Sequence, residues 1–305
     1  MADKKILIIG VTASGKSRLS FELAKKLGTD IISIDSMKVY RRMDIGTAKP
    51  SKERQSQVKY HLIDIVEPSQ SFSVDQFLTN ANEKIDLMQS IGKPVLAEGG
   101  TAMYIKALLH GIFEGPGTDA DIREKLRKRI AADGLAVLHK QLTYIDPVAS
   151  EKIHANDEKR VIRALEVYEL TGKPISSFQN HFDNPFPDDW LIIGLRREKE
   201  AESKRINARV KKMIADGLVD EVKSLLAEDK PLSQQAACAI GYAEIIEHLK
   251  GNISLADAIE KIKINTRKLA KAQRTWFKRF ENVKWFDVDE DDTAASMLDK
   301  ISNLF

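Results

Sequence analysis

The chain has 305 residues, of which 43% are hydrophobic and 30% are charged. This composition is typical of a globular protein of about two domains, and it excludes a disordered chain. The 48 Lys and Arg residues and the 45 Asp and Glu residues leave a net charge of +3, so any polyanion site must come from local clustering. A single cysteine excludes an intrachain disulfide framework and a cysteine-based zinc site, and it favours a reducing compartment.

The N-terminal residues contain no recognisable targeting segment. The apolar run Ile6–Ile9 is too short for the core of a signal peptide, and Gly10 ends it. No stretch approaches the roughly 18 apolar residues of a membrane span. We therefore expect a cytoplasmic protein without membrane association, and we expect it to be a monomer.

Short apolar runs alternate with helical patterns along most of the chain. The expected strands are Ile6–Ile9, Ile31–Ile34, His61–Ile65, Pro94–Ala97, Trp190–Leu195 and Val283–Val288. This alternation predicts an α/β fold with a parallel sheet. The stretch 114–187 shows helical periodicity and no convincing strand. We therefore expect residues 1–114 and 188–305 to form one core, with residues 115–187 inserted as an all-helical domain. The acidic tail from Asp287 is expected to be solvated surface.

The first expected strand leads into a glycine-rich phosphate-binding pattern. The pattern G-x-x-x-x-G-K-[ST] is matched by Gly10, Val11, Thr12, Ala13, Ser14, Gly15, Lys16 and Ser17, and an amphipathic helix pattern follows. The two glycines permit a tight turn in which backbone N–H groups and the helix N-terminus face phosphate oxygens. Lys16 supplies a mobile cation, and the Ser17 hydroxyl can bind Mg²⁺. The pattern predicts a P-loop NTPase-like core that binds a diphosphate or triphosphate, but it does not identify the ligand.

Polar residues follow two further expected strands. Asp35 comes directly after Ile31–Ile34, and Glu98-Gly99-Gly100-Thr101 follows Pro94–Ala97. Ligands of open α/β sheets bind at the carboxyl ends of the strands, so these residues are expected beside the phosphate loop. Asp35 could act as a general base or beside Mg²⁺, or it could simply cap a helix. Thr101 could donate to a phosphate oxygen, or its segment could be a plain turn.

Basic residues gather in two places. From Glu260 to Phe280 there are eight basic residues and one acidic residue, and five of the basic ones fall within about 80° at ~100° per residue: Lys263, Arg267, Lys271, Arg274 and Lys278. Ile262, Leu269, Trp276 and Phe280 line the opposite side. We expect the apolar side to pack on the core and the basic side to bind a polyanion, a solvated face being the alternative. A smaller cluster, Lys159, Arg160 and Arg163, starts a helix pattern in the insertion.

Together these segments resemble the tRNA dimethylallyltransferases, also called tRNA isopentenyltransferases. The resemblance runs from Ile6 to about Phe286. Besides the phosphate loop, it rests on Asp35–Tyr40, Asp44–Pro50, His61–Asp64, Gly99–Ile105, Arg160–Tyr168 and Thr171–Pro174. It implies transfer of a dimethylallyl group from dimethylallyl diphosphate to N6 of the adenine at tRNA position 37, just 3′ of the anticodon. The chemistry would then be alkyl transfer, with diphosphate as the leaving group.

The resemblance also implies residue roles. Lys16, Thr101 and Ser17 with Mg²⁺ would stabilise the diphosphate, which would also be bound by Gly10, Thr12, Ala13, Ser14, Gly15 and Lys199. Asp35 would accept the proton of the adenine amine. Contacts with tRNA would come from Asp35, Ser36, Met37, Lys38 and Thr101, and contacts with the anticodon stem-loop from Arg123, Lys159, Arg160, Arg163, Arg267, Lys271 and Arg274.

The sequence departs from the family pattern at several positions. Lys199 stands where the family tends to have Arg, Lys38 where Gln is frequent, and Leu269 and Ala272 where Tyr and Arg are common. Lys199 lacks the planar pair of N–H donors that an Arg side chain would supply, and Arg196 or Arg197 could compensate for this loss. Cys238 is expected to be a small buried residue.

Three other functions stay open at this point. A P-loop kinase of small metabolites would explain the phosphate loop, Asp35 and Mg²⁺, but it would leave the insertion and the basic helix without a role. An adenylate isopentenyltransferase would prenylate free AMP, against which the basic surface argues. A non-catalytic RNA-binding module would use only the basic surface.

Overall fold

The computed structural model describes residues 5–111, 115–178 and 187–304, and it contains two compact units. The larger unit comprises Met1–Leu109 and Phe186–Phe305, and the smaller one comprises His110–Pro185. The chain therefore leaves the larger unit once and returns to it. We expected the insertion to begin at residue 115, and residue 114, just before it, lies outside the described residues.

In the part of the larger unit that the structure describes, six parallel strands form one sheet, in the order β3-β2-β4-β1-β5-β6. They are β1 (Lys5–Gly10), β2 (Ile31–Ile34), β3 (Tyr60–His61), β4 (Leu96–Gly99), β5 (Trp190–Arg196) and β6 (Val283–Asp287). The predicted α/β fold with a parallel sheet is confirmed. The strand predicted over His61–Ile65 is wrong beyond its first residue, because Leu62 and Asp64 have positive φ angles that break the extended backbone. Strand β4 lies two residues later than predicted, so Glu98 belongs to it.

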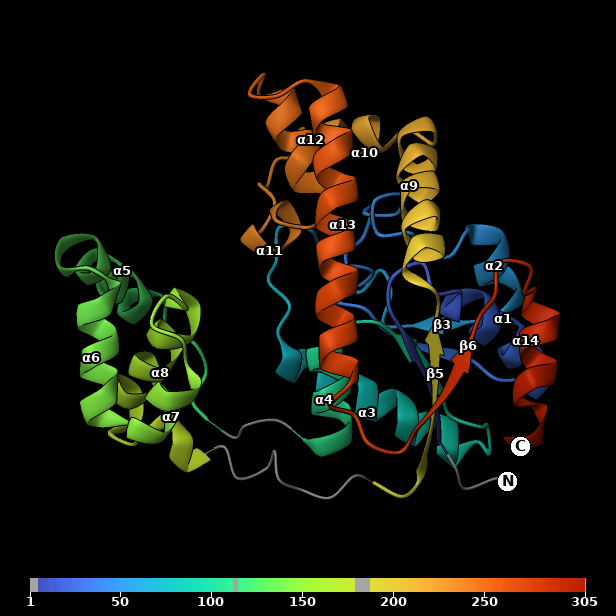
Figure 1. The fold of residues 1–305 in the computed structure, drawn as a ribbon, viewed down its shortest axis with the longest axis horizontal. Helices are drawn as coiled ribbons and strands as arrows, with labels where there is room; N and C mark the ends of the chain where they lie inside the picture. Colours follow the sequence, from blue (N-terminus) through green and yellow to red (C-terminus); the bar gives the residue numbers. More distant parts are fainter. Residues whose placement is uncertain (1–4, 112–114, 179–186, 305) are drawn as a thin grey trace. The chain divides into compact units, whose positions relative to one another are not determined.

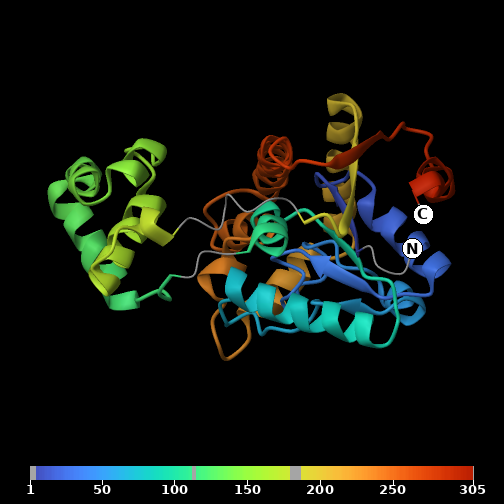
Figure 2. The ribbon, with the colours of Figure 1, turned by 90° about the horizontal axis from the view of Figure 1, so that it is seen from below.

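Two helices cover one face of the sheet. Helix α1 (Lys16–Leu27) and helix α14 (Ala294–Ile301) lie side by side there (Figures 1 and 2). Ile8 and Leu19 share an apolar cluster with Met297 and Ile301 of α14. The expectation that the acidic tail is only solvated surface is therefore wrong, because Met297 and Ile301 place an apolar stripe on the core.

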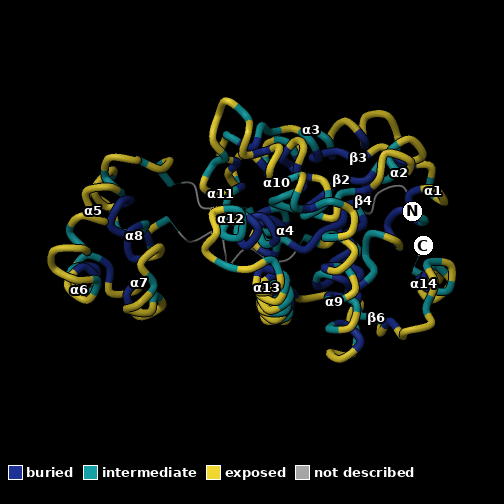
Figure 3. The backbone as a smooth tube through the Cα atoms, turned by 90° about the horizontal axis from the view of Figure 1, so that it is seen from above, coloured by how far each residue is buried: buried dark blue, intermediate teal, exposed yellow. Residues whose placement is uncertain are grey.

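Other helices pack on the opposite side of the sheet, where most of the apolar core lies. They are α3 (Val74–Ser90), α4 (Ala102–His110), α9 (Lys199–Ala215), α10 (Leu218–Leu226), α12 (Tyr242–Leu249) and α13 (Leu255–Phe277), with the short α2 (Lys52–Gln57) and α11 (Gln234–Ala237) in the connections. The strands from β1 to β5 are mostly buried, whereas the edge strand β6 has no buried residue. Helices α9 and α13 expose their outer sides (Figure 3). Both faces of the sheet are thus covered, and ligands can reach it at the ends of its strands.

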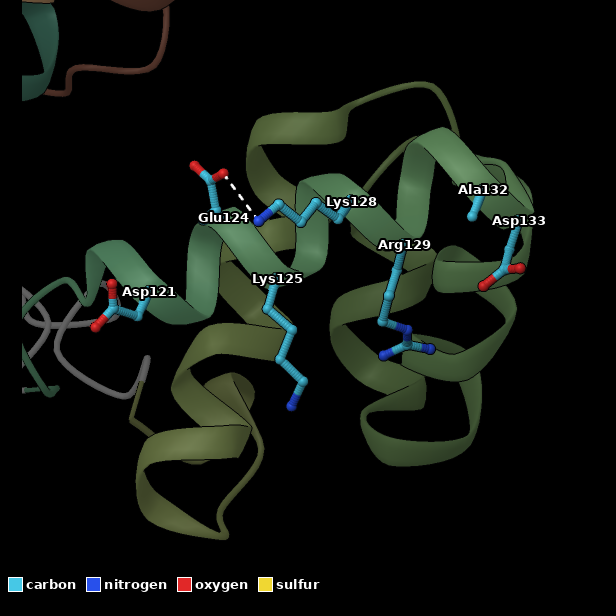
Figure 4. A pocket seen from close by; sticks show the side chains of 7 residues that line it. All are labelled: Asp121, Glu124, Lys125, Lys128, Arg129, Ala132 and Asp133. Atoms are coloured by element: carbon cyan, nitrogen blue, oxygen red, sulfur yellow. Dashed lines mark ion pairs between the residues drawn. The ribbon is translucent and has the colours of Figure 1, made fainter.

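The described part of the smaller unit contains helices and turns but no strand. Its helices are α5 (Ala120–Asp133), α6 (Leu135–Ile145), α7 (Pro147–Lys152) and α8 (Glu158–Thr171). They enclose a core of their own that includes Leu126, Leu138, Val161 and Leu165. One side of α5 carries Lys125, Lys128 and Arg129 together with acidic residues (Figure 4).

A buried network beside β2 and β3 predicts sensitivity to acid. Asp30 accepts a hydrogen bond from Lys93 Nζ at 2.8 Å and lies 2.9 Å from His61 Nε2. Burial lowers the pKa of His61 below its ordinary 6.5. Burial alone would raise the pKa of Asp30, but the hydrogen bonds from Lys93 and His61 outweigh it and lower that pKa. Both folded-state groups thus favour the deprotonated form.

We expect the free energy of unfolding to decrease as the pH falls below about 6.5, where His61 becomes protonated in the unfolded chain, and to decrease again below about 3.8, where Asp30 does. Replacing His61 by Asn should flatten the decrease between pH 7 and pH 5. Urea unfolding measured across this range tests the prediction, and an equal slope in both proteins would contradict it.

Candidate functional site

A cavity of about 800 Å³ opens at the carboxyl ends of β1, β2 and β4, within the larger unit. Its cationic side chains are Lys16, Arg18, Lys38, Arg54, Arg205 and Arg209, whereas Asp35 supplies its one carboxylate among the described residues. An apolar wall adds Met103, Val210, Met213, Ile240, Leu269 and Trp276. This combination favours an anionic ligand that also carries an apolar group.

The phosphate loop joins β1 to α1 at one end of this cavity. Ala13 and Gly15 have positive φ angles of 64° and 108°, and Gly15 caps the helix. Lys16 Nζ turns back toward the carbonyl oxygen of Val11, at 3.4 Å, and Ser17 lines the cavity. Burial lowers the pKa of Lys16 to about 8. The helix N-terminus and the lysine thus face the space where a phosphate group would bind.

Three side chains from distant helices hold the loop in place. Gln273 of α13 accepts a hydrogen bond from the Thr12 N–H at 2.8 Å and donates one to the Gly100 carbonyl at 2.8 Å. From α9, Arg205 Nε donates to the Ala13 carbonyl and Arg209 Nη1 to Thr12 Oγ1, both at 3.0 Å. None of these three contacts with the loop was predicted from the sequence. One feature of the sequence could have indicated this role for Gln273. It is an amide on the side of the α13 pattern that otherwise carries apolar residues.

Replacing Gln273 by Leu should weaken the binding of inorganic pyrophosphate about tenfold. The substitution keeps the side-chain size but leaves the Thr12 N–H and the Gly100 carbonyl without their partner. Gln273→Glu keeps an acceptor for Thr12 but sets a carboxylate oxygen against the Gly100 carbonyl and a negative charge beside the ligand, so it should lose at least as much. Calorimetric titration of each variant tests this, and equal affinity of the Leu variant and the unaltered protein would show that the bridge is dispensable.

Asp35 lies at the carboxyl end of β2, as expected, and its two oxygens differ. Oδ1 accepts hydrogen bonds from the backbone N–H groups of Met37 and Lys38, at 2.9 and 3.2 Å. This oxygen therefore closes a turn at residues 36–39, and the helix-cap alternative is wrong, because no helix begins there among the described residues. No hydrogen bond joins Oδ2 to another described residue, and Asp35 lines the cavity. The carboxylate is thus held on one side and can accept a proton on the other.

The ends of β2 and β4 approach closely beside Asp35. Thr101 Oγ1 accepts a hydrogen bond from the Ser36 N–H at 3.0 Å. A Cβ atom on Gly99 would lie 2.2 Å from the Ile34 carbonyl oxygen, so only glycine permits this approach. Thr101 and Ser36 therefore line the cavity together, next to the carboxylate.

The segment Asp44–Pro50 forms another wall of the cavity. Glu221 of α10 accepts hydrogen bonds from the N–H groups of Asp44, Ile45 and Gly46 and from the Tyr242 hydroxyl, which is 2.6 Å away. Lys49 is buried and donates to the carbonyl of Tyr40. This segment therefore shapes the wall.

The structure places some predicted residues differently. Lys199 is exposed at the first turn of α9 and does not line the cavity, because the loop meets this helix near Arg205 and Arg209 instead. Arg196 pairs with Asp287, whereas Arg197 donates to the Ser14 carbonyl at 3.2 Å. The prediction that Cys238 is buried is wrong: its neighbours Ala236 and Ala239 take the buried positions, and Cys238 lines the cavity.

The basic side of α13 is only partly open to solvent, because α9 packs along it (Figure 1). Arg274 pairs with the buried Glu202 of α9 at 3.2 Å, and Arg267 donates to Asn207 at 2.7 Å. Lys271 and Lys278 are exposed. Leu269, expected on the packed side, is 41% exposed and lines the cavity. The stripe is therefore partly an interface between two helices of the same unit.

Two arginines of the smaller unit serve its own core. Glu166 is fully buried, and it accepts hydrogen bonds from Arg123 Nε at 2.8 Å and Arg163 Nη1 at 2.7 Å. Lys159 and Arg160 are exposed in the first turn of α8. Contact of these four residues with RNA stays a prediction, and the ion pairs give Arg123 and Arg163 a structural role besides.

In the three described ranges, no three His, Cys, Asp or Glu side chains are grouped so as to hold a metal ion. A Mg²⁺ ion would have the Ser17 hydroxyl and the oxygens of a bound phosphate group. This set suits Mg²⁺, which keeps several waters and is commonly bound with substrate phosphates. None of the described helices has the length and apolar character needed to cross a membrane.

Fold and site together define an α/β P-loop protein with a helical insertion, whose cavity suits a phosphate ester with an apolar group. Comparisons with known proteins narrow this class. Residues 38–280 match the family model described as IPP transferase, and the chain belongs to this family. A tRNA dimethylallyltransferase of Geobacter metallireducens is 44% identical, over 92% of each chain.

Solved structures agree with this assignment. The full-length tRNA isopentenylpyrophosphate transferase of Bacillus halodurans is 40% identical, with a TM-score of 0.71 over 99% of this chain and 96% of that one. A eukaryotic dimethylallyltransferase acting on tRNA is 29% identical, with a TM-score of 0.84 over 99% of this chain and 79% of that one.

Proposed function

We propose that this protein transfers the dimethylallyl group of dimethylallyl diphosphate to N6 of the adenine at position 37 of tRNA, and releases diphosphate. The observation that carries the proposal is one cavity that combines the phosphate loop, the open oxygen of Asp35 and an apolar wall. The loop would hold the diphosphate, the wall the five-carbon group and Asp35 the reacting amine. Family membership and the names of its relatives support the same reaction.

In this reaction the N6–carbon bond forms while the carbon–oxygen bond of the donor breaks. The electron pair leaves with the diphosphate, whose developing charge is stabilised by the loop N–H groups, Lys16 and Arg209. Asp35 Oδ2 accepts the proton released by the amine. Mg²⁺ bound at Ser17 and the diphosphate would add further charge stabilisation. The adenine must leave its stack to enter the cavity.

The RNA contacts belong to the same proposal. Lys159 and Arg160 in the smaller unit and Lys271 in the larger one are exposed cations that can bind phosphates of the anticodon stem-loop. We further propose that the protein acts as a monomer in the cytoplasm.

Mass spectrometry of an anticodon hairpin incubated with the protein, dimethylallyl diphosphate and Mg²⁺ tests this function. We expect one dimethylallyl group on the adenine next to the anticodon. Hydrolysis of ATP without any transfer to the hairpin would favour a kinase, and prenylation of AMP in preference to the hairpin would favour an adenylate isopentenyltransferase. Binding of the hairpin without any modification would favour a non-catalytic RNA-binding module.

A further inference from the structure

An ion pair beside the phosphate loop has no part in the reaction described above. Lys38 Nζ lies 3.4 Å from Glu98 Oε1, and the two side chains are only 8% and 1% exposed. Glu98 is opposite Ile8 of β1 and Ser33 of β2, so it lies in the middle of the sheet, on the strand next to the one that leads into the loop. The pair is therefore buried close to the diphosphate site.

The hydrogen bonding of this pair is incomplete. The Lys38 ammonium has three N–H donors, and Glu98 Oε1 is the one acceptor that it reaches among the described residues. Glu98 Oε2 is buried and has no hydrogen-bond partner there either. A buried ammonium group whose N–H donors have no acceptor is energetically unfavourable, unless a ligand accepts hydrogen bonds from them. Lys38 also lines the cavity, so a ligand could reach it.

Lys38 and Lys16 line the same cavity, and two cations there favour an anionic ligand between them. Besides burial, the charge of Glu98 raises the pKa of Lys16 and the charge of Lys38 lowers it. The Lys38 ammonium is thus close enough to the phosphate-loop lysine for their two charges to interact. An acceptor between the two ammonium groups would be an oxygen of the bound diphosphate.

We propose that Lys38 is a second diphosphate-binding lysine, which Glu98 holds beside Lys16. This inference rests on the proposed function and assigns the Lys38 side chain to the leaving group. One N–H of Lys38 stays with Glu98, while the others donate to diphosphate oxygens. As the carbon–oxygen bond breaks, the electron pair passes to the diphosphate and Lys38 adds a second ammonium charge to its stabilisation. Glu98 is a positioning residue.

A double variant separates this role from simple neutralisation of Glu98. Lys38→Met with Glu98→Gln has the same net charge as the unaltered protein and leaves no unpaired buried charge. Titration with inorganic pyrophosphate in EDTA should show binding weakened tenfold or more, because a charged hydrogen-bond donor is lost. If Lys38 only neutralises Glu98, the double variant will bind pyrophosphate within twofold of the unaltered protein, and the proposal fails.

Controls make the result specific. Lys26→Met removes an exposed lysine from the last turn of α1 and should leave pyrophosphate binding unchanged. Thermal unfolding confirms that the double variant folds, and binding of an unmodified hairpin should stay as it is. A loss of hairpin affinity with unchanged pyrophosphate affinity would assign Lys38 to the nucleobase and overturn the proposal. Pyrophosphate binding does not depend on prenyl transfer, so failure of the proposed reaction remains distinguishable.

Discussion

Replacing Asp35 by Asn should lower the rate of prenyl transfer to an anticodon hairpin by about 10²- to 10⁴-fold. Asn keeps an oxygen for the N–H groups of Met37 and Lys38, so the turn after β2 is retained. What disappears is the charge on Oδ2, which would accept the proton of the amine. Single-turnover rates at saturating donor and hairpin measure this chemical step directly.

The affinities of the Asp35→Asn variant for pyrophosphate and for the hairpin should stay close to those of the unaltered protein. Asp220→Asn, at an exposed position of α10, is the matched control and should retain the full rate. A rate for Asp35→Asn within threefold of the unaltered protein would remove proton acceptance from Asp35. The carboxylate would then serve only to close the turn after β2, through the two hydrogen bonds that Oδ1 accepts.

Lys16→Met should weaken pyrophosphate binding and kcat/KM for the donor by about 10²-fold, because the one ammonium group of the loop is lost. The pKa of Lys16 is lowered to about 8 by burial, so in the free protein this ammonium loses its proton as the pH rises through that value. The ratio of the two affinities, unaltered protein over Met variant, should therefore shrink between pH 7.5 and pH 9.5.

Calorimetric titration with pyrophosphate in EDTA at several pH values checks this dependence. Comparing two proteins at each pH cancels the ionisation of pyrophosphate itself. A ratio that stays constant to pH 9.5 would mean that Lys16 keeps its proton throughout, and a ratio near one at pH 7.5 would mean that the lysine does not touch the ligand.

The parts of this site that the sequence predicted are those whose geometry is local. Eight consecutive residues form the phosphate loop, and its positive φ angles at Ala13 and Gly15 depend on neighbours in the chain. The general rule that ligands bind at the carboxyl ends of parallel strands was enough to bring Asp35 and Thr101 to the same cavity. The central strands β1, β2 and β5 were recognisable because buried parallel strands are nearly continuous apolar runs, whereas the prediction for β3 was mostly wrong.

The residues that sequence reasoning missed act across long separations in the chain. Gln273 of α13 and Arg209 of α9 both form hydrogen bonds with Thr12 of the loop. Lys199 and Arg209 are ten residues apart on α9, which corresponds to about 15 Å along a helix. A pattern read along this helix cannot show which of its turns meets the loop, and the contact falls at Arg209.

Helical periodicity likewise determines which residues share a side of a helix, but not what covers that side. The sequence alone therefore determined the α/β core, the phosphate loop and the basic stripe of α13. Tertiary packing decided that α9 covers part of this stripe and that Glu202 pairs with Arg274. It also brought Lys38 to Glu98, 60 residues away. The physical reason is that an isolated charge is compatible with many partners, and only the packing of distant elements selects one.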